Sequence, residues 1–182
     1  MFKLGHYVDG SWREYSHPAL FSVARTEGDR EKVLTAAPGS DALIFVTLAE
    51  LLTPPCFLLY VLHTPRGEGP PGRYQSDEMN RGEVGEFLRR FADLLRVDAR
   101  FDLWLHSPAD QATIVWDRHD LIHAYGPTAS YVATLRGLGF EAGELAIPAP
   151  HEHHYHAACD EQARAVIDSG WRHSPLKPED EQ

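Results

Sequence analysis

Apolar side chains recur along this chain at two spacings, and each spacing predicts a different kind of element. Residues 84–95 carry six apolar side chains on one helical stripe, the pattern of an amphipathic helix: Val84, Phe87, Leu88, Phe91, Leu94 and Leu95. Residues 101–106 instead alternate apolar and polar side chains, and the apolar runs 113–116 and 121–125 follow after polar turns. Such short runs separated by turns predict an antiparallel meander of three strands.

Turn residues place the elements near the N-terminus. Asp9-Gly10 lies between two alternating segments and predicts a tight hairpin, because both positions of its turn need a positive φ. A further strand is expected at residues 19–25. The polar segment 26–39 predicts only a short helical turn.

Two prolines divide the most apolar part of the chain. Residues 40–53 show helical spacing, and that helix must end before Pro54-Pro55. The continuous apolar run 56–62 then predicts a strand buried on both faces. Residues 63–76 are rich in glycine and proline and predict a loop. The GxGxxG pattern within this loop contains two prolines and no helix follows it directly, so we expect no dinucleotide cofactor.

A helix that connects two parallel strands is expected in the second half of the chain. Pro127 suits the first turn of a helix that ends near Gly137 or Gly139, and residues 145–147 predict a return strand parallel to 121–125. Together these elements predict an α+β fold, with a mixed, mainly antiparallel sheet and helices packed on it. We expect one domain over residues 1–173 and a flexible acidic tail at 174–182.

Charge narrows the classes of partner. The 182 residues carry a formal net charge of −10 at pH 7, which argues against binding to nucleic acid or to an anionic membrane surface and suits a basic protein partner. Glu50 and Pro54-Pro55 interrupt the apolar stretch 42–62, so no membrane span is expected. The first residues lack the charged-then-apolar pattern of a signal sequence, and we expect a cytoplasmic protein.

Histidines cluster near the C-terminus, where four of them fall within six residues: His151, His153, His154 and His156. Neutral imidazole is a common ligand of zinc and similar divalent transition metals, so the cluster is a candidate metal site. On an extended segment, alternate side chains face opposite sides, so each face presents two ligands. A third ligand must then come from elsewhere in the chain.

The cluster resembles metal-binding motifs of two families over a few residues each. His151-x-His153-x-Tyr155-His156 resembles the HxHxDH motif of metallo-β-lactamases, with Tyr155 in place of the aspartate. His154-x-His156 followed by Glu161 is similar to the first cupin motif, without its flanking glycines. Because both patterns are incomplete, neither resemblance assigns a family or a function.

The expected topology also suggests which residues could join the cluster. If strands 121–125 and 145–147 run parallel, the cluster lies at the sheet edge that also carries the turn 106–111. His106 and Asp110 are therefore the expected additional ligands. The turn Asp117-Arg118-His119-Asp120 is expected at the opposite edge, where its aspartates serve as ordinary turn residues.

Two classes of function remain open. The chain contains no complete catalytic motif, which favours a non-enzymatic binding or interaction protein with an acidic surface. The alternative is a metal-dependent hydrolase of the zinc type that uses the histidine cluster. In that enzyme, Glu152 or Asp110 would act as the general base.

Overall fold

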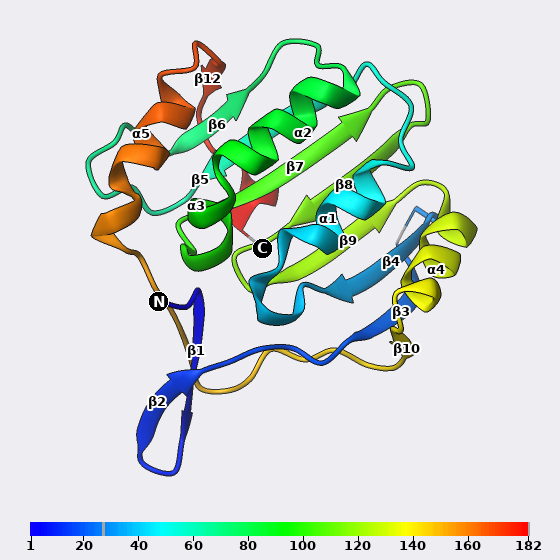
Figure 1. The fold of residues 1–182 in the computed structure, drawn as a ribbon, viewed down its shortest axis with the longest axis horizontal. Coiled ribbons are helices and arrows are strands. Elements are labelled where there is room, and N and C mark those ends of the chain that lie inside the picture. The colour runs from blue at the N-terminus through cyan, green and yellow to red at the C-terminus, as the bar shows by residue number, and fades with distance from the viewer. Residues whose placement is uncertain (27, 182) are drawn as a thin grey trace.

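The computed structural model describes residues 1–26 and 28–181 of the chain (Figure 1). Its helices are α1 (Ala42–Ala49), α2 (Arg81–Arg90), α3 (Ala92–Val97), α4 (Thr128–Gly137) and α5 (Asp160–Ile167). Its strands are β1 (Leu4–Val8), β2 (Ser11–Glu14), β3 (Leu20–Arg25), β4 (Glu31–Ala36), β5 (Phe57–Leu62), β6 (Gly72–Gln75), β7 (Phe101–Ser107), β8 (Ala112–Trp116), β9 (Leu121–Tyr125), β10 (Glu141–Ala142), β11 (His151–His153) and β12 (Arg172–Ser174). Among the described residues, no helix has the length and apolar character needed to cross a membrane.

The described strands form two β-sheets. The larger sheet has the strand order β10-β3-β4-β9-β8-β7-β5-β6-β12, and the smaller has the order β11-β1-β2. Neighbouring strands are antiparallel except β10, which runs parallel to β3. In Figure 1 the β1–β2 hairpin extends away from the large sheet at the lower left.

The hydrophobic core lies between the large sheet and the helices on one of its faces. Helices α1, α2 and α3 cover this face in Figure 1, and α4 packs against β4 and β9. Fully buried side chains from strands and helices form one cluster there, among them Phe45, Leu58, Ile114, Trp116 and Leu135. The α+β class predicted from the sequence is therefore confirmed.

Local sequence signals explain several elements. Asp9 and Gly10 adopt φ values of 51° and 78°, the conformation that a two-residue primed hairpin turn requires. Asn80 and Glu83 form a capping box at the start of α2, because each side chain accepts a hydrogen bond from the other's backbone N–H. The predicted stripe at 84–95 is helical, but it divides into α2 and α3 at Phe91, whose φ of −106° and ψ of 17° interrupt the regular helix.

Three segments differ from the expectation. Residues 31–36 form β4, inside the segment expected to be mainly polar loop, and residues 72–75 form β6. The strand expected at 145–147 is absent, and only Glu141–Ala142 pair with the sheet. A helix does connect two parallel strands, β9 and β10, but β4 and β3 lie between them.

The last residues also contact the sheet. β12 pairs with β6, and Asp180, which is 2% exposed, accepts a hydrogen bond from Lys177 N and lies 3.5 Å from Arg73. Asp180 and Glu179 lie near Trp104, on the face of the sheet opposite the helices. Gln182, the last residue of the expected tail, lies outside the described residues.

Candidate metal site

The turn between β8 and β9 is held by its own aspartates. Asp117 Oδ1 accepts hydrogen bonds from the backbone N–H groups of His119 and Leu121, at 2.8 and 2.9 Å. Asp120 has a φ of 60°, and its carboxylate accepts a hydrogen bond from Trp116 Nε1. These bonds close the turn and fix the backbone that carries the His119 ring, as expected of aspartates in a turn.

The smaller sheet brings a second segment to this turn. On β11, His151 and His153 lie on the same face because alternate residues of a strand share a face. β11 pairs with β1, and Lys3, just before β1, is 1% exposed. Lys3 Nζ lies 3.1 Å from Asp120 Oδ1 and 4.4 Å from the centre of the Trp116 ring. This buried ion pair anchors the small sheet beside the β8–β9 turn.

The two segments bring three histidines together. One ring nitrogen of each of His119, His151 and His153 lies within 4.8 Å of the other two. The His119 ring centre is 4.6 Å from that of His153 and 5.4 Å from that of His151. In a tetrahedral zinc site with Zn–N bonds of about 2.1 Å, ligand nitrogens are about 3.4 Å apart. The ring nitrogens of the triad therefore lie at most about 1.4 Å farther apart than a bound zinc ion requires.

The protonation states also suit metal binding. Burial, together with the neighbouring His119 and His151, lowers the pKa of His153 to about 4, so its ring is neutral at pH 7. His153 Nε2 is buried and has no hydrogen-bond partner among the described residues. His151 Nδ1 lies 3.0 Å from the carbonyl of Pro148, which can only accept, so Nδ1 is the donor and Nε2 is the ring nitrogen left to face a metal ion.

A carboxylate stands behind the triad. Asp117 Oδ2 lies 3.7 Å from His119 Nδ1 and 3.2 Å from His123 Nε2. Burial opposes the charge on Asp117, but hydrogen bonds from His119 and His123 hold its pKa well below the usual range. The residues present therefore offer three imidazole ligands and an outer carboxylate, the donor set that zinc and related ions take in proteins.

The other histidines predicted as ligands lie apart from this triad. His154 lies on the opposite face of the strand, with its ring edge-on to Phe2, and His156 Nε2 donates to the Phe2 carbonyl at 2.9 Å. His106 is exposed on β7, and its Nδ1 lies 2.9 Å from Thr113 Oγ1.

The two carboxylates expected as general bases do not approach the triad either. Glu152 alternates with His151 and His153 on β11, so it faces away from them, and its Oε1 lies 3.1 Å from His154 Nε2. Asp110 accepts hydrogen bonds from the backbone N and the hydroxyl of Thr53, which lower its pKa.

The sequence-based placement of the cluster at the His106 edge is wrong, and so is the exclusion of His119. β10 starts at the edge of the sheet that carries the 117–120 turn, because Glu141 pairs with Leu20. Since β10 is only two residues long, the chain does not cross the sheet. It runs along the same edge to β11 (Figure 1). The sequence pattern does not indicate that the strand after α4 is only two residues long, and the position of the histidine cluster depends on that length.

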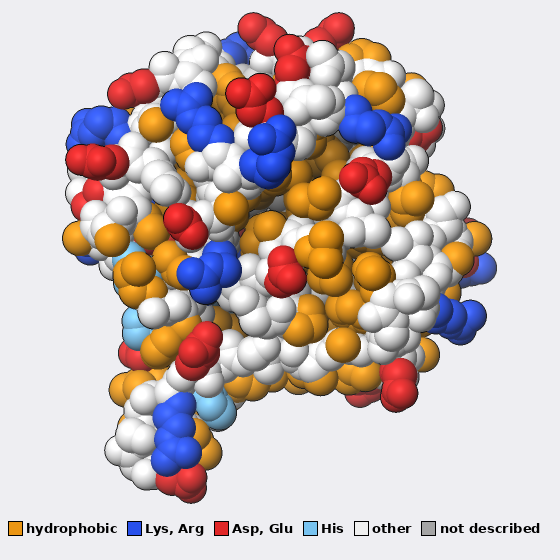
Figure 2. Space-filling view, viewed as in Figure 1, with side chains coloured by type: hydrophobic (Ala, Val, Ile, Leu, Met, Phe, Trp, Pro, Cys, Tyr) orange, Lys and Arg blue, Asp and Glu red, His pale blue; other side chains and the backbone are white. Residues whose placement is uncertain are grey.

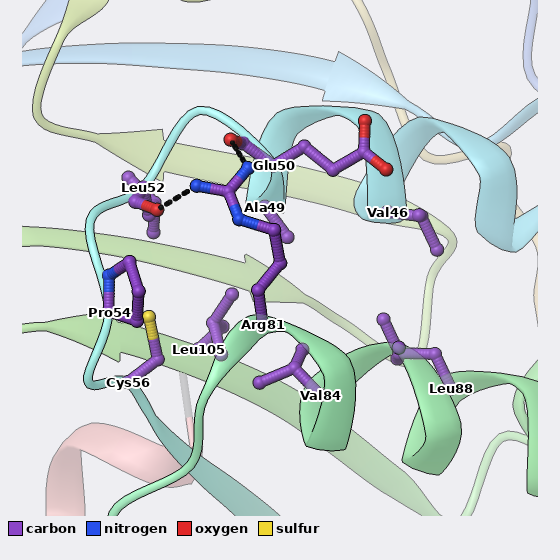
Figure 3. Close-up of a pocket in the computed structure, with 11 residues that line it drawn as sticks. Val46, Ala49, Glu50, Leu52, Pro54, Cys56, Arg81, Val84, Leu88 and Leu105 are labelled. Atoms are coloured by element: carbon purple, nitrogen blue, oxygen red, sulfur yellow. Dashed lines mark hydrogen bonds between the residues drawn. The ribbon is translucent and has the colours of Figure 1, made fainter.

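One of the main pockets of the described chain, of about 440 Å³, reaches the outer carboxylate, because Asp117 and His123 line it. One small pocket, of about 60 Å³, lies between α1, α2 and β7, with apolar walls that include Val46, Val84 and Leu105 (Figure 3). Arg81 closes one side by donating to the carbonyls of Glu50 and Leu52. Neither this pocket nor the four other main ones is lined by His119, His151 or His153.

Comparison of the chain with protein-family models, with curated proteins and with solved structures finds no match.

Proposed function

We propose that this protein is a non-enzymatic binding protein that takes one divalent transition-metal ion, of the zinc type, at His119, His151 and His153. The observation that carries the proposal is the approach of three ring nitrogens from two separate segments to within 4.8 Å of one another. Imidazole nitrogen suits zinc, copper and nickel ions better than it suits calcium or magnesium.

The ion would join the two sheets. His119 belongs to the large sheet's β8–β9 turn, whereas His151 and His153 belong to the small sheet. An ion that binds the folded state alone stabilises it by about 2.7 kcal/mol when its concentration is 100 times Kd. Zinc would therefore hold β11 and the β1–β2 hairpin against the large sheet.

The geometry favours binding over catalysis. A hydrolytic zinc site keeps a bound water beside a substrate cleft and needs a base aimed at that water. The three histidines line none of the five main pockets, although Asp117 behind them lines one, and Glu152 faces the other side of β11. Neither Glu152 nor Asp110, the two expected general bases of the alternative zinc hydrolase, is therefore placed to act on a water bound at the triad.

The test is calorimetric titration of metal-free, tag-free protein with zinc sulfate. We expect about one ion per chain, and loss of that binding in each of His119→Ala, His151→Ala and His153→Ala. Two controls should bind as the wild type does: His154→Ala, from the same segment, and His106→Ala, from the far edge of the sheet. Absence of saturable binding, or equal loss in the controls, would refute the proposal.

A second assay separates binding from hydrolysis. The zinc-loaded protein is mixed with p-nitrophenyl acetate and p-nitrophenyl phosphate, with free zinc as the reference. The proposal expects no turnover above that reference. Turnover that disappears in His119→Ala would establish the hydrolase instead.

A further inference from the structure

A groove of about 350 Å³ lies on the far side of α2 from the small apolar pocket, and it does not include the metal ligands. It runs between α2, the loop that joins β6 to α2, and the turn between α5 and β12. Three aromatic rings line it: Phe87, Phe91 and Trp171. Phe87 stacks on Trp171 with ring centres 5.1 Å apart, and its ring centre is 4.8 Å from that of Phe91. Phe87 and Phe91 are buried, at 7% and 2% exposed, so the half-buried Trp171 is the ring of this aromatic floor that a bound side chain can reach.

The rim of this groove is acidic. Four carboxylates line it, with Arg90 as the single basic residue: Asp77, Glu78, Glu83 and Glu86. Glu83 is engaged in the capping box of α2. Within the described part of the chain, the carboxylates of Asp77, Glu78 and Glu86 have no basic side chain within 4.0 Å. In Figure 2, acidic side chains gather at the top of the face, over the loop that leads into α2.

A guanidinium group of the chain itself contacts one of these rings. The guanidinium carbon of Arg90 lies 5.1 Å from the centre of the Phe91 ring, within the range of a cation–π contact. A flat guanidinium can stack on an aromatic face and donate two parallel hydrogen bonds to a carboxylate, whereas an ammonium cannot do both. The floor and the rim together match the chemistry of an arginine side chain.

We propose that this groove binds an arginine side chain from a basic segment of a partner protein. The arginine would stack on the floor beside Trp171, and its guanidinium would pair with the rim carboxylates. Charge complementarity selects this occupant, since Asp77, Glu78 and Glu86 lie beside a single cation, Arg90, at a groove that is open to solvent. The site is independent of the metal triad, so each proposal can fail without the other.

The test is fluorescence anisotropy with a fluorescein-labelled peptide of alternating arginine and glycine. We expect saturable binding that weakens as salt rises. The variant Asp77→Asn/Glu78→Gln/Glu86→Gln should bind at least about tenfold more weakly, because it loses three exposed charge pairs. All three positions are exposed, so the variant should fold normally.

Two controls separate the groove from the general negative charge of the protein. Glu14→Gln/Glu141→Gln/Glu144→Gln removes the same charge from exposed positions outside the groove and should leave the affinity within about twofold. A peptide with citrulline in place of arginine keeps the shape without the charge and should not bind. Equal weakening in the two triple variants, or undiminished binding of the citrulline peptide, would overturn the proposal.

Discussion

Replacement of the buried Arg100 by methionine should destabilise the protein strongly. Arg100 is 0% exposed, and its guanidinium donates to Asp98 at 2.7 and 2.8 Å and to Glu68 at 2.9 Å. It also donates to Asp160 and to the carbonyl of His156. Burial opposes its charge, but these bonds raise its pKa above the ordinary value. One side chain thus joins β7 to the 63–76 loop, to α5 and to the segment after β11.

The expected cost follows from the carboxylates that Arg100→Met leaves behind. The side chains of Asp98 and Glu68 are 0% exposed, so they would remain buried without their cation. Removal of one partner from a buried ion pair costs about 3–5 kcal/mol. For a chain of this size, that loss lowers Tm by roughly 6–20 °C.

Urea unfolding followed by circular dichroism measures this effect. The midpoint should fall while the slope with urea stays the same, which would show that stability has changed and compactness has not. Arg66→Met is the matched control. It removes an ion pair to Asp160 whose side chains are 38% and 35% exposed, and it should cost no more than about 1 kcal/mol. A loss below about 1 kcal/mol for Arg100→Met, or equal losses in the two variants, would refute the reasoning.

Three further predictions concern helix propensity, the outer carboxylate and pH. Gly85 lies inside α2, and a Cβ there would meet no atom within 4 Å, so Gly85→Ala should raise the free energy of unfolding by about 1 kcal/mol through helix propensity; a lower urea midpoint would contradict this. Asp117→Asn should weaken zinc binding about tenfold or more in a competition titration, because it alters the carboxylate behind His119; unchanged affinity would contradict the role of that carboxylate. Because the folded state lowers the pKa of His153 from 6.5 to about 4, the unfolded state binds more protons between these values, and metal-free protein should lose stability as pH falls through this window. With allowance for solvent screening, the free energy of unfolding of the wild type should fall by about 1 kcal/mol more than that of His153→Gln between pH 7 and pH 5. Equal falls in the two proteins, measured by urea unfolding, would contradict the lowered pKa of His153.

Elements set by local rules could be predicted from the sequence. The Asp9-Gly10 turn needs only two residues with positive φ, and the stripe at 84–95 needs only helical spacing. β4 was missed because its core position 35 is a threonine, which is fully buried and donates its hydroxyl hydrogen to the Leu20 carbonyl. Hydropathy does not indicate that a polar side chain will be buried with a partner from another strand.

The candidate site depends on contacts between distant parts of the chain, and only two of its three histidines could be predicted. His151 and His153 follow from the clustering of histidines and from the alternation of a strand. His119 could not be predicted, since its position depends on a two-residue β10 and on the Lys3–Asp120 ion pair. Arg100 likewise gives no signal in the sequence, because its three carboxylate partners come from separate segments.

The most direct test of the metal site is an anomalous difference map at the zinc edge, from crystals of the protein grown with one equivalent of zinc. We expect one strong peak about 2.1 Å from a ring nitrogen of each of His119, His151 and His153. A peak at His106, His154 or His156 alone, or no peak at the triad, would rule out the metal site.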